Sequence, residues 1–249
     1  MRKAFVSIIV AGLYLVAVQP LSAQDEAHAI IEKAIKAHGG AEKLSQVKAT
    51  QTKAKGTLEI MGMSVDITEE AMLQMPGQLK ESLQLNINGM QISVTTGFNG
   101  KKGWISAGGM VMDMDDKLVK EVQEALYLAN MNGFTALKDK TYKVAPLGES
   151  KVNDRPVLGV KISSEGHRDV NFYFDKSTGL LAKIEHRALD YQAMQEVDEE
   201  RFLLDYQEID GLKVPKKAKV TRDGKKYLEL EITEYKRVDK IDASEFARP

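Results

Sequence analysis

Four histidines are the residues of this chain best suited to general base catalysis or to metal binding. His28 and His38 lie ten residues apart near the N-terminus, His167 follows Gly166 in a predicted turn, and His186 lies in a predicted strand. A metal site or a catalytic base needs partner groups held close by, and this spacing forms no recognisable pair. Solvated or hydrogen-bonded histidines are the simpler interpretation, which predicts no metal, no cofactor and no catalytic residue.

The acidic residues offer no clearer catalytic pair. Asp66, Glu69 and Glu81 stand alone on predicted strands, where we expect them to face water or a sheet edge. Three aspartates within 113–116 precede a helical stretch, and helix capping explains them better than a calcium loop, which needs a fuller set of oxygen ligands. Nucleophile-elbow, zinc-protease and phosphate-loop motifs are also absent from the sequence. We therefore expect that the protein is not an enzyme.

Methionine is concentrated on the apolar sides of the strand-like segments between Thr50 and Met114. Its flexible, polarizable side chain adapts to ligands of variable shape, so this region is the candidate site for an apolar ligand. Ordinary core filling is the alternative, and periodicity alone does not separate the two. The predicted lining of a ligand groove comprises Met61, Met63, Val65, Ile67, Leu83, Leu85, Ile92, Val94, Met110 and Met112.

Two helices are predicted to accompany these strands. From Asp25 to His38 the apolar residues recur at steps of three and four, and Gly39-Gly40 ends the pattern. A short helical turn follows over 41–47. After the three aspartates, an apolar stripe that includes Val122 and Leu126 predicts a central helix ending near Asn132-Gly133.

Alternation of apolar and polar residues predicts about a dozen strands. Asn88-Gly89 and Asn99-Gly100 are typical of tight hairpin turns, and 190–200 is predicted to be a charged, exposed loop. A dozen strands are too many for one flat sheet. We therefore expect a mainly β fold, a strongly curved antiparallel sheet forming a half-open, unclosed β-barrel covered by the N-terminal helix and the central helix. The predicted strands cover 50–60, 61–75, 79–87, 90–98, 104–105, 110–112, 142–144, 158–162, 170–174, 180–184, 202–206 and 227–235.

The first 23 residues have the layout of a secretory signal. Arg2 and Lys3 precede the uncharged run 4–18, and a small-residue site ends at Ala23, after which cleavage is predicted. A membrane anchor is the alternative, but the run of 15 residues is shorter than the roughly 20 that a spanning helix needs. Cleavage leaves Gln24–Pro249 as one domain without a linker and without a stable membrane span.

The composition narrows the set of partners. The sequence has no cysteine, so it offers neither a disulfide nor the lipid-modified cysteine of a bacterial lipoprotein. Removing Arg2 and Lys3 leaves 33 basic and 36 acidic residues, a formal charge of −3, spread without strong blocks. The charge pattern gives no reason to expect nucleic acid as a partner.

Several short motifs, in a fixed order, resemble the outer-membrane lipoprotein-sorting proteins of bacteria. They are Ala-His-Gly-Gly at 37–40, the stretch 98–104, Phe174-Asp175 before Thr178-Gly179-Leu180, Asp205-Tyr206 before Asp210-Gly211-Leu212 and Val214-Pro215, and a final Phe246. The resemblance spans nearly the whole of 24–249. It implies a periplasmic protein with a half-open β-barrel whose apolar hollow takes the acyl chains of lipoproteins.

One feature that the resemblance implies has no counterpart here. The lipoprotein carrier proper uses an arginine on its early strands to hold the lid shut, whereas this chain has no arginine between Gln24 and Asp154. The expected function is therefore a soluble periplasmic carrier or binder of lipid acyl chains or of lipidated protein. The alternative is an envelope stress-sensing or scaffold protein of the same fold that binds a protein partner, which a filled hollow would favour.

Overall fold

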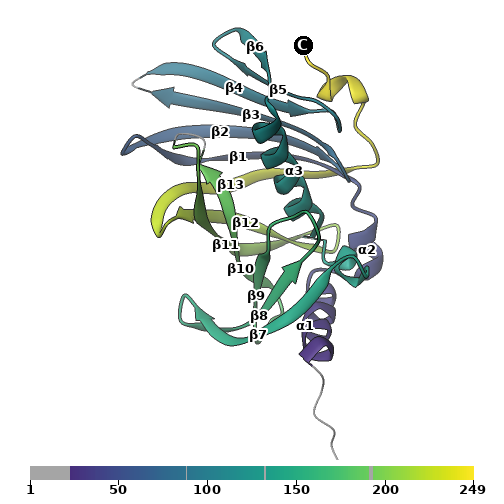
Figure 1. Ribbon diagram of the computed structural model, residues 1–249. Helices are drawn as coiled ribbons and strands as arrows, with labels where there is room; N and C mark the ends of the chain where they lie inside the picture. Colours follow the sequence, from purple (N-terminus) through teal and green to yellow (C-terminus); the bar gives the residue numbers. More distant parts are fainter. Residues whose placement is uncertain (1–22, 88, 132, 191–192) are drawn as a thin grey trace, which may run out of the picture.

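Thirteen antiparallel strands form one curved sheet, and the helices lie on its concave side (Figure 1). The computed structural model describes residues 23–249 except 88, 132 and 191–192. The predicted signal peptide thus falls almost wholly outside the described residues, and its cleavage after Ala23 stays a prediction. Within the described part, no helix is long and apolar enough to cross a membrane.

The elements follow the predicted order. The helices are α1 (Ala23–Ala37), α2 (Ala41–Ser45), α3 (Asp116–Met131) and the short 3-10 helices η1 (Thr135–Lys138) and η2 (Ala243–Phe246). The strands are β1 (Ala49–Ile60), β2 (Met63–Gln74), β3 (Gln78–Ile87), β4 (Met90–Phe98), β5 (Gly103–Ala107), β6 (Met110–Asp113), β7 (Lys143–Val152), β8 (Arg155–Ser163), β9 (Val170–Asp175), β10 (Leu181–Asp190), β11 (Gln195–Ile209), β12 (Leu212–Arg222) and β13 (Lys225–Val238).

Pairing of the first strand with the last joins two runs of hairpins into one sheet. The order is β6-β5-β4-β3-β2-β1-β13-β12-β11-β10-β9-β8-β7, so β6 and β7 are the edges and the sheet stays open. The pairs Ile67–Leu85 and Leu85–Ile92 show how directly opposed residues continue the same apolar face from strand to strand. The mainly β, half-open fold with an N-terminal and a central helix is confirmed.

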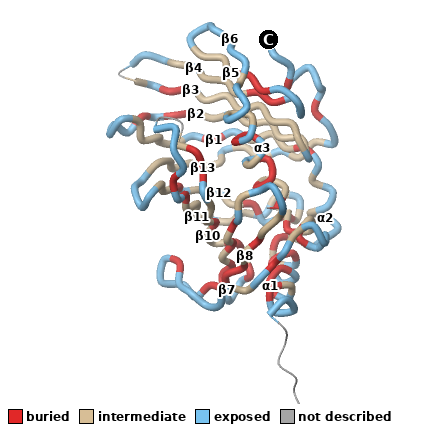
Figure 2. Tube along the Cα trace, viewed as in Figure 1, coloured by how far each residue is buried: buried red, intermediate tan, exposed pale blue. Residues whose placement is uncertain are grey.

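The helices cover different parts of the concave face. α1 packs on β7 and β8, and its buried residues share a core with Phe134 and with Phe172 of β9. Farther along the sheet, Val122 and Leu126 of α3 pack against Phe98 at the end of β4. Figure 2 shows buried residues gathered near α1 and mainly intermediate burial along β2–β5. The core is thus dense at the β7–β10 end and looser toward β1–β5.

The start of α3 is capped as predicted. The Asp115 side chain accepts a hydrogen bond from the Leu118 amide at 2.9 Å, which satisfies one of the free N–H groups of the first turn. Trp104 is buried, and its indole N–H donates to the Phe246 carbonyl at 3.2 Å. The C-terminal segment is thereby fixed against β5.

Two stretches differ from the prediction. β7 continues to Val152, well beyond the expected strand, although it is an edge strand with few buried residues. The predicted loop at 190–200 is wrong for its second half, because β11 begins at Gln195 and Glu199 is buried. Its many charges suggested exposure, but cationic side chains from neighbouring strands neutralise them.

Candidate binding cavity

A cavity of about 550 Å³ lies between the concave face of the sheet and the layer formed by α2, the end of α3 and η1. This volume falls within the range of about 300–1,000 Å³ typical of small-molecule sites. The strands β1, β10, β11, β12 and β13 supply most of its inner wall. Its apolar surface includes Leu73, Phe134, Ile184, Leu203, Ala218 and Ile232.

The corner between α1 and α2 closes one end of the cavity. Gly39 adopts φ = 120°, and a Cβ atom there would lie 2.3 Å from the carbonyl oxygen of Gly211, so only glycine permits this approach. The Lys213 amide donates to the His38 carbonyl at 3.1 Å. The Ala-His-Gly-Gly motif thus docks the corner onto the β11–β12 hairpin and places His38 in the cavity wall.

His38 lines this wall as a neutral ring. Its Nδ1 is 2.8 Å from the Ala34 carbonyl, to which it donates, and its Nε2 accepts from the Leu181 amide at 3.4 Å. Burial lowers its pKa, and the bond to Ala34 offsets this only in part. The centre of the imidazole ring lies 4.7 Å from the centre of the Phe134 ring and 5.6 Å from that of the Tyr206 ring. Both ring nitrogens form hydrogen bonds with the backbone, so the role of His38 in the cavity wall is structural.

Leu203 and Tyr206 of β11 both line the cavity, although strict alternation would place them on opposite faces of the sheet. Asp205, between them, adopts φ = 52°, and the register with β12 stays constant on either side while Asp205 and Lys216 are left out of the pairing. The left-handed backbone at Asp205 thus interrupts the alternation without adding a residue to the strand. Tyr206 joins Leu203 in the lining, and its hydroxyl donates to the Leu181 carbonyl at 2.8 Å.

Arg201 is the charged residue on the inner wall. It extends from β11 into the cavity and also lines a neighbouring cavity of about 170 Å³. Its Nη2 donates to Glu199 at 3.1 Å, while its buried Nε has no hydrogen-bond partner within the described chain. Burial alone would raise the pKa of Glu199, but interactions with His186, Arg201 and Arg222 lower it.

Two carboxyl groups lie close to Arg201 from the opposite part of the sheet. Glu69 of β2 and Glu81 of β3 are half-buried on the concave face, and each interacts electrostatically with Arg201. Burial and repulsion from Glu81 raise the pKa of Glu69 to about 7, and burial raises the pKa of Glu81. The prediction that these two residues face water is wrong, whereas Asp66 is exposed as expected.

The ten predicted lining residues lie outside this cavity. Met61 is in the β1–β2 turn and is 86% exposed, while Met63, Met110 and Met112 are 50–66% exposed. Strand pairing puts the other nine on the concave face, where Val65, Ile67 and Leu85 form a buried cluster with half-buried Leu83, Ile92 and Val94. Their role in ligand binding stays a prediction. The described cavity is lined by other residues.

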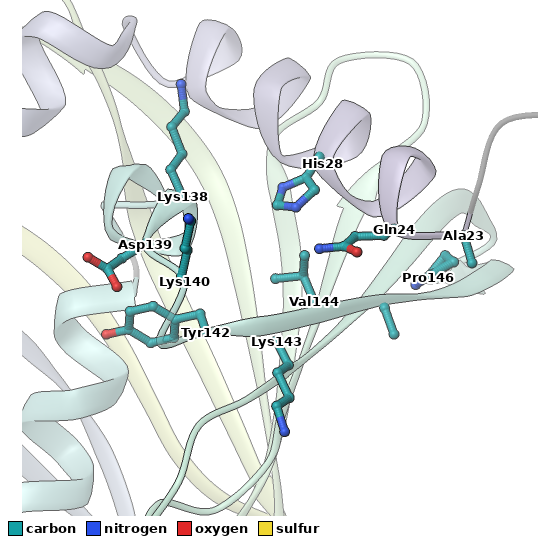
Figure 3. Close-up of a pocket in the computed structure, with 11 residues that line it drawn as sticks. Ala23, Gln24, His28, Lys138, Asp139, Lys140, Tyr142, Lys143, Val144 and Pro146 are labelled. Atoms are coloured by element: carbon teal, nitrogen blue, oxygen red, sulfur yellow. The ribbon is translucent and has the colours of Figure 1, made fainter.

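A second groove, about 440 Å³, lies beside the start of α1 (Figure 3). His28 and Gln24 point from α1 toward Val144 of β7, and Lys138, Lys140 and Lys143 lie around it. This groove is open and about half of its lining is polar, so it matches an apolar ligand less well than the larger cavity does. Among the described residues, no cluster of three His, Cys, Asp or Glu side chains could hold a metal ion.

Comparison with known proteins places the fold. No family model and no curated protein matches the sequence. Solved structures with a similar fold include a DUF1329 family protein from Desulfovibrio piger (TM-score 0.56, 12% identity, 89% of this chain and 97% of that one). A LolA superfamily protein from Nitrosomonas europaea is also similar, with a TM-score of 0.55 and 12% identity over 89% of this chain and 97% of that one. A third is a putative outer membrane lipoprotein-sorting protein domain from Vibrio parahaemolyticus, with a TM-score of 0.52 and 10% identity over 90% of this chain and 97% of that one.

These likenesses define the class of fold. The chain has the half-open barrel of the lipoprotein-sorting proteins, as the resemblance of its motifs predicted. The match extends over nearly all of each solved chain. At 10–12% identity, it is the architecture that is shared.

Proposed function

We propose that this chain is a periplasmic protein that binds lipid acyl chains, free or attached to a protein, by burying them reversibly in the cavity between sheet and helices. The observation that carries the proposal is the cavity itself, about 550 Å³ with a mainly apolar wall. A carrier was expected to have an open hollow and a sensor or scaffold a filled one. The cavity therefore favours the carrier.

The energetics suit reversible binding. Burying an acyl chain contributes about 0.8 kcal/mol per methylene, so roughly twelve methylenes provide on the order of 10 kcal/mol. Association and ordering cost about 4–15 kcal/mol, which leaves a modest net affinity. The proposal needs no catalytic group, because a carrier only has to bind and release.

The layer over the cavity is suited to opening. α2 has five residues, none of them buried, and it joins α1 and β1 through short connections. Leu44 of α2 and Val47, just after the helix, nevertheless line the cavity. Outward movement of α2 would expose the apolar wall with little loss of packing, and we propose this as the route of entry.

Co-purification tests this function. The exported domain, purified without detergent, is extracted with organic solvent for mass spectrometry, and uptake of a fluorescent fatty acid is measured by titration. We expect a co-purifying lipid and saturable uptake. Absence of both would refute the proposal.

A pair of variants on one strand locates the binding site. Ala218 faces the cavity, while the next residue, Lys219, is exposed. Ala218→Phe fills part of the cavity and should reduce uptake about tenfold or more, whereas Lys219→Phe should change it less than twofold. Thermal unfolding of both variants checks that they fold. Equal uptake by Ala218→Phe and the wild type would place the ligand elsewhere.

A further inference from the structure

The charged residues around the cavity are all basic. Of the described residues that line it, Lys48, Arg201 and Lys213 carry charge at neutral pH, and none is an aspartate or glutamate. The whole chain has slightly more acidic than basic residues. The lining therefore differs in sign from the average surface, which favours an anionic ligand over a neutral or cationic one.

The three basic groups are not equivalent. Lys48 is exposed, between α2 and β1, and the Lys213 amine donates to Glu208 at 3.0 Å. Arg201 instead projects from the middle of β11, beside Leu203 and Ile184. A charge next to apolar groups is less screened by solvent than one at the rim. Arg201 is thus the strongest candidate for recognition of a head group.

The guanidinium of Arg201 has unused capacity to donate. Glu199 accepts from Nη2, and Glu199 also accepts from Arg222 Nε at 3.0 Å, so one carboxylate is shared by two arginines. The buried Nε of Arg201 has no partner in the described chain. An unpaired buried donor is costly, and an anionic oxygen placed beside it would remove that cost.

Resting on the proposed function, we propose that the cavity selects anionic amphiphiles, with a carboxylate or phosphate head group bound by Arg201 and the acyl chain against the apolar wall. Arginine suits this role because its planar donors match carboxylate and phosphate oxygens. The head group would lie inside the cavity, and the chain would run from Arg201 past Leu203 and Ala218 toward α2.

The neighbouring carboxyl groups are compatible with an anion at this place. Glu199 is paired with arginines, and the remaining acidic groups that interact with Arg201 are Glu69 and Glu81. Burial and mutual repulsion raise the pKa of Glu69 to about 7 and burial raises that of Glu81, so near neutral pH this pair is partly protonated. Glu69 and Glu81 therefore neutralise the positive charge of Arg201 only in part.

Matched probes test the selectivity. The full exported domain is titrated with a pyrene-tailed fatty acid and with the alcohol of the same chain length. We expect the acid to bind about tenfold more tightly, the size of one charge-assisted hydrogen bond. Equal affinities would overturn the charge selectivity and leave the proposed function intact. Binding of neither probe would instead contradict the proposed function.

Variants test the role of Arg201. Arg201→Gln should remove the preference for the acid while binding of the alcohol changes less than twofold, and Arg201→Lys should keep part of the preference. The rim variant Lys48→Gln is the control and should keep it all. Loss of the preference in Lys48→Gln but not in Arg201→Gln would overturn the assignment. If Arg201→Gln fails to fold, the lysine variant decides: a reduced or lost preference for the acid supports the role of Arg201, and an unchanged preference opposes it.

A phosphate probe separates the two sources of an anionic head group. Monoacylglycerol phosphate is compared with the fatty acid and with neutral monoacylglycerol of the same chain length. Tighter binding of either anion than of the neutral lipid supports the inference and identifies the head group. Binding of the neutral lipid as tightly as both anions would refute it.

Discussion

Arg201 and Glu69 interact across the hollow of the sheet, although β12, β13 and β1 separate their strands. Strand pairing places both on the concave face, and the curvature of the sheet brings their side chains into electrostatic range. Glu81 joins them from β3. The curled sheet therefore places charged residues inside the hollow that the sequence separates by more than a hundred positions.

Replacing Glu69 should make stability less dependent on pH. Its pKa is about 7 in the folded protein, against an ordinary value of 4.5. Between pH 4.5 and pH 7 the folded state therefore binds more protons than the unfolded state. The free energy of unfolding then falls as pH rises through this window, by about 3 kcal/mol. Urea unfolding at several pH values should show a flatter profile for Glu69→Gln than for the wild type.

The outward-facing Asp66 on the same strand provides the control. Asp66→Asn should leave the pH profile unchanged, because this residue is exposed. A Glu69→Gln profile as steep as that of the wild type would show that the buried carboxyl does not cause the dependence.

His38 should give a dependence of the opposite sign. Burial lowers its pKa below the ordinary value of 6.5, so the unfolded state binds the proton more readily. Its stabilising effect is complete above pH 6.5 and is lost as pH falls through the lower folded pKa. His38→Gln should cost about 1–3 kcal/mol at neutral pH, because the Leu181 amide loses its acceptor, and should remove the slope on the acid side.

His28 is the matched comparison, since it is half-buried in the open groove beside α1. His28→Gln should change the free energy of unfolding by less than about 0.5 kcal/mol. Equal losses in the two variants would contradict the structural role assigned to His38.

Gly97 should tolerate no side chain. It pairs with Trp104, and a Cβ atom at this position would lie 2.2 Å from the indole ring. The indole is held by Phe246, so it has little freedom to move away. Gly97→Ala should destabilise the protein by about 1–3 kcal/mol in urea unfolding. At Gly77 an added Cβ would meet nothing within 4 Å, and Gly77→Ala should be nearly neutral.

The sequence was sufficient to predict the architecture but not the site. Alternation along β2 and β3 correctly grouped Ile67 with Leu85, because a strand with one buried face obeys a period of two. The left-handed backbone at Asp205 interrupts that period inside β11, so Leu203 and Tyr206 both line the cavity although an odd number of residues separates them. No local pattern marks such an interruption in advance.

The charged part of the site was missed for a related reason. Glu199 lies in the run 190–200 that was predicted to be an exposed loop, and Arg201 follows it directly. Only the partner strands show that Glu199 is buried between arginines. Glu69 and Glu81 likewise appeared as isolated charges. A useful signal was available in retrospect, since Glu69 and Glu81 both stand at positions of their strands where apolar residues alternate.

The exposed methionines allow a final test of where the ligand binds. Met63, Met110 and Met112 lie on the concave face but outside the cavity, at 50–66% exposure. Replacing all three by glutamine should change fatty-acid uptake less than twofold, because the cavity wall keeps its apolar area. Leu203→Gln, which puts an amide into that wall, should weaken uptake about tenfold or more. The reverse result would move the acyl chain out of the cavity and onto the methionine-bearing strands.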